Sequence, residues 1–384
     1  MTADPGDQGN VYMQRALSLA ARGLYTTDPN PRVGCVLVRD GQIVGEGWHE
    51  RAGQAHAEVA ALRAAGNAAR GATAYVTLEP CNHQGRTPPC TDALIAAGVR
   101  RVISAAIDPN PRVAGAGVKR LEDAKIAVAV GCHEAETRAL NVGFFSRFER
   151  GRPWIRLKLA MSLDARTAPA GGGHLWISGE ASRADVQTWR ARSGAILTGA
   201  GTVRVDDPRL DVRLAYGPWV RQPLRVVLDP ALTCPPTAQV FRNGQAVVFA
   251  AQGAVRPDSG QSLHSPGVAE ERVPAVGRHL DLAAVVARLS ALQINELLVE
   301  CGPTLAAGFL EAHLVDELIL YVAPVLLGAD AAPLTALTDL SNADRVAAAF
   351  EFVGSERLGA DLRLTLRPRA AAARGAAPGG MAEA

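Results

Sequence analysis

The chain has 384 residues, of which 48% are hydrophobic, and its 40 lysines and arginines nearly balance 38 aspartates and glutamates, for a formal net charge of +2. This length suggests two or three domains with enough apolar residues for their cores. The near-neutral charge, without a polybasic block or interleaved aromatic and basic residues, does not indicate nucleic acid as a partner.

Cysteine usage and the amino-terminal segment bear on the cellular compartment. The six cysteines are scattered without a framework of close pairs, which favours a reducing environment. Residues 1–10 are polar and lack the apolar core of a signal peptide, and no apolar run reaches the ~20 residues that a membrane span requires. We therefore expect a cytoplasmic protein without a membrane partner.

The first 150 residues alternate between helical and strand patterns. Asp40-Gly41 is a strong turn signal and predicts a hairpin between two β-rich segments. The expected strands are 33–38, 43–48, 74–78, 101–106 and the second part of 118–130, and the expected helices are 11–23, 56–65, 89–97, the first part of 118–130 and 134–148. This alternation predicts a sheet with helices on both faces.

The segment from His56 to Cys90 carries the strongest chemical pattern of the chain. It contains His56, Glu58, Cys81 preceded by a proline, and Cys90. One imidazole and two thiolates can hold Zn²⁺ and leave its fourth position to water, whose pKa then falls from ~15.7 towards ~7. Glu58 can lie beside the metal and move protons from this water to a leaving amine. The pattern is typical of zinc deaminases, although eight residues separate the two cysteines here where the usual motif has two.

A structural zinc site is the alternative for the same residues. Such a site needs a fourth protein ligand, and His83 is the only nearby candidate; it lies between the two cysteines, where it can equally face a substrate. The catalytic interpretation is favoured because His-x-Glu and Pro-Cys occur together, each where a strand or loop would give way to a helix.

A short segment rich in arginine and glycine, 149–153, is the expected linker to a second series of elements. Strands are expected at 154–160, 195–198, 224–228, 246–250, 296–300 and 317–322, and helices at 180–192, 282–292 and 304–311. Residues 256–278 are rich in Pro, Gly and Ser and predict a loop, while the composition of 369–384 predicts a disordered tail. We thus expect one domain at 1–150 and another at 151–368.

Two places in the second half suit a bound phosphate. The strand at 296–300 runs into Gly302 and a helix, and the strand at 195–198 runs into Gly199 and Gly201. A strand that turns through glycine into a helix N-terminus exposes free N–H groups and the positive end of the helix dipole. The Gly-x-Gly-x-x-Gly fingerprint is absent, and each corner alone is also compatible with a structural turn. Two corners in one domain favour a phosphorylated cofactor or substrate.

The complete set of motifs resembles the bifunctional deaminase/reductase family of riboflavin biosynthesis. The resemblance spans roughly residues 10–367 and rests on Pro29-Asn30-Pro31-Arg32-Val33-Gly34-Cys35, His56-Ala57-Glu58, residues 77–90, Lys158-Leu159-Ala160-Met161-Ser162-Leu163-Asp164, Trp176-Ile177-Ser178, Asp206-Asp207-Pro208 and Glu300-Cys301-Gly302-Pro303-Thr304. It implies an α/β fold class, with a cytidine-deaminase-like α/β/α domain followed by a dihydrofolate-reductase-like α/β domain.

The resemblance also implies two reactions. The first is zinc-dependent removal of the 2-amino group of 2,5-diamino-6-(5-phosphoribosylamino)pyrimidin-4(3H)-one. The second is NADPH-dependent reduction of the ribosyl group to ribityl, which gives 5-amino-6-(5-phosphoribitylamino)uracil.

Residue roles follow from the resemblance, position by position. His56, Cys81 and Cys90 are implied to bind one Zn²⁺, with Glu58 as the proton carrier. The implied substrate contacts of the deaminase are Asn30, His49, His83 and Arg86. The implied NADPH contacts are Ala160, Trp176, Thr202, Asp206, Pro230, Gly302, Pro303, Thr304, Leu305, Ala306, Ala307 and Gly308, and the implied substrate contacts of the reductase are His174, Arg190, Leu210, Arg213 and Glu300.

Elementary chemistry supports part of this transfer. Arg190 and Arg213 each offer a planar fork to a phosphomonoester, although a solvated helix face and a loop charge are ordinary roles for such residues. Asp206 can accept hydrogen bonds from ribose or amide groups, or it can form a turn. Trp176 can flank a cofactor ring, or it can fill the core.

Three positions depart from the family pattern. His174 stands where a serine that contacts substrate is expected. Pro230 stands where a serine usually approaches the cofactor, and it has neither a hydroxyl nor an N–H, so only packing or its carbonyl could serve. Asn82 replaces the more usual serine after Cys81, a change that we expect to be harmless.

Two other functions fit parts of the pattern. A nucleic-acid base deaminase with an accessory C-terminal binding domain uses a similar zinc motif, but the near-neutral charge and the two glycine corners disfavour it. A regulatory zinc module without turnover would not need Glu58. The sequence therefore predicts a cytoplasmic bifunctional enzyme that acts on small molecules, and it leaves homo-oligomerisation open.

Overall fold

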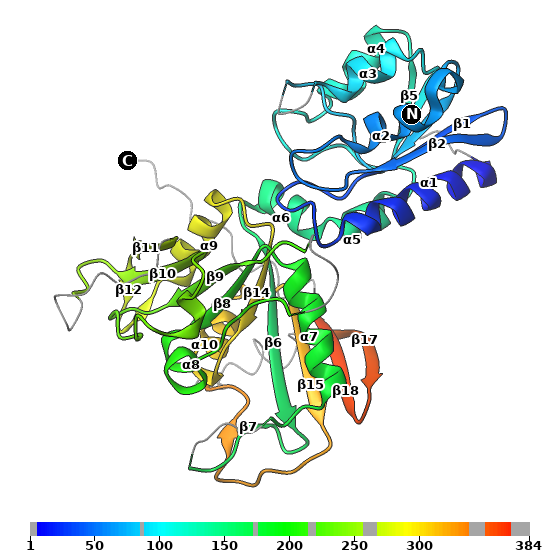
Figure 1. Cartoon of the computed structure of the whole chain (residues 1–384). Coiled ribbons are helices and arrows are strands. Elements are labelled where there is room, and N and C mark those ends of the chain that lie inside the picture. Colours follow the sequence, from blue (N-terminus) through cyan, green and yellow to red (C-terminus); the bar gives the residue numbers. More distant parts are fainter. Residues whose placement is uncertain are drawn as a thin grey trace, which may run out of the picture. The chain divides into compact units, whose positions relative to one another are not determined.

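The computed structural model describes residues 6–84, 88–171, 176–213, 220–255, 267–337 and 350–369. The chain divides into two compact units: unit 1 ends at Pro153 and also takes in short segments at Arg221 and Gln293–Asn295, and unit 2 holds most of the remainder. The elements of both units are labelled in Figure 1. The predicted disordered tail lies, apart from Arg369, outside the described residues.

Unit 1 contains a five-stranded sheet in the order β2-β1-β3-β4-β5. Its strands are β1 (Gly34–Arg39), β2 (Gln42–Trp48), β3 (Thr73–Val76), β4 (Arg101–Ser104) and β5 (Ala127–Val130), and its helices are α1 (Gly6–Ala20), α2 (Ala57–Ala65), α3 (Cys90–Ala96), α4 (Ala116–Asp123), α5 (Glu134–Leu140) and α6 (Val142–Arg150). Strand β1 pairs antiparallel with β2 and β3, while β3, β4 and β5 run parallel. The predicted hairpin turn is confirmed, with φ of 50° at Asp40 and 74° at Gly41.

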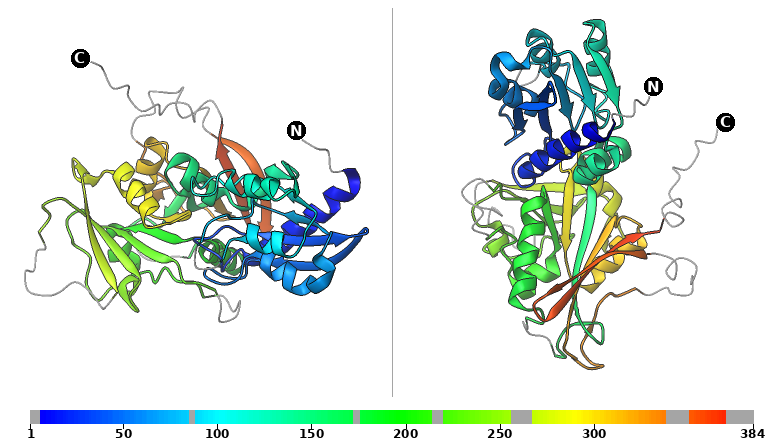
Figure 2. Two further views of the ribbon diagram at one scale, coloured as in Figure 1. Left: turned by 90° about the horizontal axis from the view of Figure 1, so that it is seen from above. Right: turned by 90° about the vertical axis from the view of Figure 1, so that its right-hand side faces the viewer.

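Helices cover both faces of this sheet, as the sequence predicts. On one face, Met13, Ala16 and Leu19 of α1 pack on Val36, Tyr75 and Ile103. On the other, residues of α2, α3 and α4 pack on the alternate side chains of the same strands. Figure 2 shows the unit from two further directions. The three layers fix where the first turns of α2 and α3 meet the sheet.

Glycines on β2 bring α2 unusually close to the sheet. A Cβ at Gly47 would lie 2.4 Å from the Ala61 nitrogen and 2.5 Å from the Ala57 oxygen, and one at Gly45 would lie 2.4 Å from the Ala61 oxygen. No residue with a side chain fits there without displacing the helix. This contact holds the N-terminus of α2, where His56 and Glu58 lie.

The single helix predicted over 134–148 is wrong, because the chain breaks at Asn141 into α5 and α6. Asn141 has φ of −114°, and its side chain forms hydrogen bonds with the backbone of Arg32. Its Oδ1 accepts the Arg32 N–H at 2.8 Å, and its Nδ2 donates to the Arg32 carbonyl at 3.0 Å. The Arg32 guanidinium also donates to the carbonyls of Leu24 and Leu140. These contacts tie the end of α5 to the loop that carries Asn30.

Unit 2 contains a nine-stranded sheet in the order β11-β10-β9-β8-β14-β6-β15-β18-β17. The strands of unit 2 are β6 (Trp154–Ser162), β7 (Arg166–Ala168), β8 (Ala195–Gly199), β9 (Leu224–Leu228), β10 (Ala246–Ala251), β11 (Val268–Val273), β12 (Ala275–Val276), β13 (His279–Leu280), β14 (Glu296–Glu300), β15 (Glu317–Ala323), β16 (Ala332–Pro333), β17 (Phe350–Leu358) and β18 (Asp361–Pro368). The helices are α7 (Glu180–Arg192), α8 (Ala200–Asp206), α9 (Leu282–Ala291) and α10 (Pro303–Glu311).

Most of the large sheet is parallel. Strands β8, β14, β6 and β15 run in one direction with β9, β10 and β11, while β18 runs antiparallel to both of its neighbours, β15 and β17. The carboxyl ends of the parallel strands therefore lie along one edge of the sheet. In open α/β sheets this edge is where ligands bind.

Two parts of unit 2 differ from the sequence prediction. The predicted loop at 256–278 is wrong in its second part, where β11 and β12 form; residues 256–266 lie outside the described ranges. The hairpin of β17 and β18 was not predicted. Strands β11 and β17 are exposed edge strands and do not bury the apolar face that reveals a strand in a sequence, whereas β18 lies between β15 and β17 and is mostly half-buried. Among the described helices, none is both long and apolar enough to cross a membrane.

Candidate active sites

The three predicted zinc ligands converge in unit 1. His56 is the N-cap of α2, Cys81 lies in the segment after β3, and Cys90 is the first residue of α3. Their ligand atoms all lie within 4.8 Å of one another, with His56 Nδ1 3.2 Å from Cys90 Sγ and 3.5 Å from Cys81 Sγ. Tetrahedral zinc with bonds of ~2.0 Å to nitrogen and ~2.3 Å to sulfur places such atoms roughly 3.6 Å apart. The arrangement fits one Zn²⁺.

Glu58 lies beside this group in the first turn of α2. Glu58 is only 3% exposed, and this burial raises the pKa of its carboxyl to about 7, although the neighbouring His56 opposes the shift. A carboxyl that titrates near neutral pH is suited to both accepting and returning a proton. The position fits the proton carrier that the sequence predicts.

Asn30 and His49 are brought together next to the ligand group. His49 Nδ1 lies 3.0 Å from the Ala55 carbonyl, so this nitrogen carries the proton and Nε2 accepts the hydrogen bond from Asn30 Nδ2 at 3.1 Å. Burial lowers the pKa of His49, which keeps the ring neutral. The His49 ring is 5.3 Å from the His56 ring, centroid to centroid, and nearly perpendicular to it. A neutral imidazole and an amide therefore line the approach to the metal position.

Of the other two predicted substrate contacts of the deaminase, the structure describes His83 but not Arg86. His83 does not belong to the group of three ligands, so the fourth ligand of a structural zinc site is not supplied there. Its Nδ1 is buried without a hydrogen-bond partner in the described part of the chain, which leaves it available to a substrate. Arg86 lies outside the described residues.

In unit 2 the two glycine corners face each other across neighbouring strands. β8 and β14 pair in parallel, and each runs into a helix at its carboxyl end. A Cβ at Gly302 would lie 3.9 Å from Thr202 Oγ1, and one at Gly199 would lie 3.3 Å from Leu305 Cδ2. Neither α8 nor α10 has a side-chain N-cap hydrogen bond. Their free N–H groups and dipole ends suit the phosphates of a nucleotide.

Not every predicted side chain can reach a ligand at this edge. Ala306 and Ala307 of α10 and Leu210 are 0%, 4% and 2% exposed, and Leu210 packs in the core beside β8 and β9. Only their backbone groups could take part. Gly308 contacts Leu282 instead, since a Cβ there would lie 3.4 Å from its Cδ1.

Of the remaining predicted cofactor residues, Trp176 and Asp206 are exposed, whereas Ala160 and Pro230 are half-buried. Trp176 is 62% exposed, so its alternative role as core is wrong; the Arg183 guanidinium lies 5.4 Å from its ring centroid. Asp206 is exposed at the end of α8. Pro230 follows β9, and its carbonyl already accepts the Ala251 N–H at 3.1 Å. His174 lies outside the described residues.

Arg190 and Glu300 form a buried ion pair. Arg190 Nε and Nη2 donate to the two Glu300 oxygens at 2.7 and 2.8 Å, and Nη1 donates to the Asp211 carbonyl at 3.1 Å. Burial alone would raise the pKa of Glu300, but Arg190 outweighs it and holds that pKa below its usual range. Arg213 is more exposed and pairs with the Asp211 carboxylate at 2.9 Å. The solvated-face role for Arg190 is therefore wrong.

Lys158 was missed as a site residue by the sequence analysis. It pairs in register with Glu300 across β6 and β14, and its ammonium lies 5.8 Å from the Tyr321 ring centroid. Burial lowers the pKa of Lys158, and Glu300 partly offsets this shift. The sequence placed Lys158 in a family motif without a role, and only the strand register reveals its charged neighbour Glu300.

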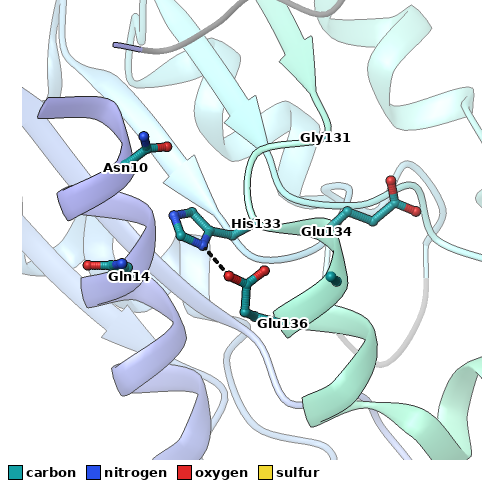
Figure 3. A pocket seen from close by; sticks show the side chains of 7 residues that line it. Asn10, Gln14, Gly131, His133, Glu134 and Glu136 are labelled. Carbon is teal, nitrogen blue, oxygen red and sulfur yellow. Dashed lines mark hydrogen bonds and ion pairs between the residues drawn. The ribbon is translucent and has the colours of Figure 1, made fainter. Parts of the chain in front are cut away.

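A separate polar pocket of about 450 Å³ lies on unit 1 between α1 and the start of α5. Figure 3 shows Asn10 and Gln14 on one wall and His133, Glu134 and Glu136 on the other. His133 Nδ1 is hydrogen-bonded to Glu136 at 2.8 Å. None of the predicted site residues lines this pocket.

Comparisons with known proteins agree with both sites. Residues 7–106 match the model of the cytidine and deoxycytidylate deaminase zinc-binding region, and residues 153–364 match that of the RibD C-terminal domain. Riboflavin biosynthesis protein RibD of Escherichia coli (strain K12) is 49% identical over 94% of this chain and 99% of its own length. The corresponding Haemophilus influenzae protein is 46% identical over 94% and 98%.

Solved structures give the same picture. Acinetobacter baumannii RibD is 45% identical, with a TM-score of 0.87 over 94% of this chain and 99% of that one. A deaminase/reductase from Thermotoga maritima is 33% identical, with a TM-score of 0.81 over the same shares of the two chains.

Fold and sites together define a zinc-dependent deaminase of the cytidine-deaminase type joined in one chain to an NADPH-dependent reductase. The chain belongs to the RibD family of riboflavin biosynthesis proteins. The fold class predicted from the sequence is confirmed.

Proposed function

We propose that residues 1–150 remove the 2-amino group of 2,5-diamino-6-(5-phosphoribosylamino)pyrimidin-4(3H)-one and that residues 151–368 reduce the ribosyl group of the product to give 5-amino-6-(5-phosphoribitylamino)uracil. The main support is the group of His56, Cys81 and Cys90, with the buried Glu58 carboxyl beside it. The Thermotoga maritima relative is described as a diaminohydroxyphosphoribosylaminopyrimidine deaminase and 5-amino-6-(5-phosphoribosylamino)uracil reductase.

In the deaminase, His56, Cys81 and Cys90 would hold Zn²⁺, which would supply a water acidic enough to lose a proton at neutral pH. The Glu58 carboxylate would accept a proton and return it to the amino nitrogen that leaves as ammonia. Asn30 and the neutral His49 orient the pyrimidine, and His83 offers its unpartnered Nδ1 to the substrate. Arg86 is assigned to the substrate by its motif alone.

In the reductase, NADPH would bind at the carboxyl edge of the sheet and supply the hydride. The N-terminal turns of α8 and α10, with Thr202 and residues 302–305, would hold its phosphates, and residues 306–308 would offer backbone groups alone. Ala160, Trp176, Asp206 and Pro230 complete the proposed cofactor contacts. Arg190, Arg213, Glu300, His174 and the backbone of Leu210 face the phosphoribosyl substrate.

A nucleic-acid base deaminase is the alternative function, with unit 2 as a binding domain. The formal net charge of +2 gives no electrostatic reason for such a partner. We propose small molecules as the only substrates, without nucleic-acid or membrane partners, and a cytoplasmic location. A filter-binding assay with RNA that showed tight, salt-dependent retention would favour the alternative.

We also propose that the chain forms homo-oligomers. The supporting feature is β17, an edge strand whose Phe352 and Val353 are 72% and 49% exposed. Exposed edge strands with apolar side chains favour pairing with another chain. Light scattering should give a mass above that of one chain, and Phe352→Glu should lower it.

The central test is Glu58→Gln. Because Glu58 is assigned to proton transfer and not to the metal, this variant should keep stoichiometric zinc. Its deamination rate should fall ~10²–10⁴-fold or more. Metal analysis and single-turnover assays measure the two effects. Loss of zinc would make Glu58 a ligand and would overturn its role.

Cys81→Ala and Cys90→Ala provide the complementary test. Each should release zinc, since three protein ligands leave none to spare. A folded variant that retained zinc fully would exclude the replaced cysteine from the ligand set.

A further inference from the structure

Glu79 is a buried carboxylate close to the metal site with no assigned task. It lies two residues before Cys81 and is 3% exposed. Its carboxylate accepts hydrogen bonds from four backbone N–H groups, and no arginine or lysine pairs with it in the described part of the chain. A buried charge of this kind needs a specific arrangement of donors to be tolerated.

The donors all come from one segment, 108–118, that enters α4. Oε1 accepts the N–H groups of Gly117 at 2.9 Å and Val118 at 3.1 Å. Oε2 accepts those of Gly115 at 2.9 Å and Asp108 at 3.2 Å. An ordinary helix cap satisfies one or two such groups from a neighbouring position. Glu79 satisfies four, from residues 29 to 39 positions further along the chain.

Packing makes the same contact rigid. A Cβ at Gly117 would lie 2.0 Å from the Pro80 carbonyl oxygen and 3.1 Å from Glu79 Oε1, so only glycine fits. Pro80 also restricts the chain between Glu79 and Cys81, because its ring fixes φ. On the other side, the Glu79 N–H donates to the Ala106 carbonyl at 2.9 Å.

Cys81 is also held from the opposite direction. Its carbonyl accepts the Thr91 N–H at 3.2 Å, and its Sγ accepts the Cys90 N–H at 3.4 Å. The cysteine thus lies between the first turn of α3 and the segment that Glu79 anchors. Replacing a group that orients a metal ligand in this way typically costs 10- to 100-fold in metal affinity or activity.

The geometry points to Glu79 as a positioning residue of the deaminase, which sets where the Cys81 thiolate meets the metal through its four hydrogen bonds to the 108–118 segment. This inference rests on the proposed zinc site. Glu79 touches neither the metal position nor the substrate in this role; it acts through Pro80 and Cys81.

Glu79→Gln is the direct test in the full-length protein. The amide nitrogen must face two backbone N–H groups, and a donor cannot accept from them. We expect the zinc dissociation constant, measured by chelator competition, to rise about 10- to 100-fold. With Co²⁺ in place of zinc, the visible spectrum should shift because the thiolate geometry changes. The kcat of deamination should fall with little change in KM, and NADPH-dependent reduction should keep its rate.

Two further variants make the result decisive. Glu122→Gln changes an exposed glutamate of α4 and should match the parent in zinc affinity and Co²⁺ spectrum. Gly117→Ala keeps the carboxylate but displaces the contact with Pro80, and it should show the same changes as Glu79→Gln. Parent-like zinc affinity and Co²⁺ spectrum in either folded variant, Glu79→Gln or Gly117→Ala, would overturn the inference. Zinc retained in Cys81→Ala would instead overturn the ligand assignment on which it rests.

Discussion

Three carboxyl groups in the described part of unit 1 are almost completely buried, and their neighbours give them different chemistry. Glu58 and Asp108 are 3% and 7% exposed, and burial is the first cause that raises the pKa of each to about 7. Glu79 is equally buried but accepts four N–H groups. The same carboxyl group therefore serves proton transfer at Glu58 and anchors a segment at Glu79. At Asp108 it makes the stability of the unit depend on pH.

Asp108 allows a prediction about pH. Its folded pKa of about 7 lies above the ~4 of an unfolded aspartate, so folding takes up a proton between these values. The favourable contribution is complete below pH ~4 and is lost as pH rises through 7. Asp108→Asn removes this titration and should raise the melting temperature of unit 1 at pH 8 relative to the parent, with the difference shrinking towards pH 5.

Differential scanning calorimetry on zinc-free protein measures this pH dependence without competition from the metal charge. Asp123→Asn, at an exposed position paired with Lys119, is the control and should show no such trend. A constant difference between Asp108→Asn and the parent from pH 5 to pH 8 would contradict the assignment.

Among the elements of unit 2, α7 and β14 are joined by the Arg190–Glu300 pair, whose side chains are 10% and 12% exposed. Arg190→Ala leaves a buried carboxylate without its partner, which costs about 3–5 kcal/mol. The variant should lower the unfolding temperature of unit 2 and weaken substrate binding together. Thermal unfolding and the KM for the phosphoribosyl substrate test both effects.

Arg213 offers the contrast. Its guanidinium is 46% exposed and its ion pair is worth at most about 1 kcal/mol, so Arg213→Ala should raise the substrate KM with little change in stability or NADPH affinity. Arg209→Ala removes another exposed partner of Asp211 and is the matched control. Equal KM values for the Arg209 and Arg213 variants would remove Arg213 from the substrate site.

The sequence was sufficient for elements with a buried apolar face. Helix α7 was predicted at its observed bounds, and strands β1, β9 and β14 within a residue or so. It failed at β11 and β17, which are exposed edge strands without an alternation between core and solvent. It also left out β18, although Leu362, Leu364 and Leu366 alternate there with polar residues. It also failed at Asn141, whose helix break depends on contacts with Arg32 more than one hundred residues away in sequence.

For the sites, local motifs identified the ligands and the glycine corners, because metal and phosphate chemistry need fixed residue types at short spacing. Lys158, Asp108 and Glu79 were not predicted, since their roles depend on strand register with Glu300, on burial in the folded unit, and on backbone groups of a distant segment, respectively. Ala306, Ala307 and Leu210 show the opposite error: a motif position does not reveal that its side chain is buried.

On the scale of the whole molecule, the chemistry is divided between the two units. Among the described residues, the His56, Cys81 and Cys90 group is the one that could hold a metal, and it lies entirely in unit 1. A chelator that removes zinc should therefore abolish deamination and leave NADPH oxidation with the deaminated substrate unchanged. Spectrophotometric assays of both reactions on one preparation give the comparison; a parallel loss of reduction would show that the sites are not independent.

The contacts of Arg32 and Asn141 decide where the chain can be cut to separate the deaminase unit from the reductase unit. The deaminase family model ends at residue 106, yet the loop with Asn30 is fastened by the side chain of Asn141 and the carbonyl of Leu140. A fragment trimmed to the matched region would keep every proposed zinc ligand and release the loop that orients the pyrimidine. The smallest fragment expected to keep the complete deaminase site therefore extends through Asn141, well past residue 106, where the match to the family model ends.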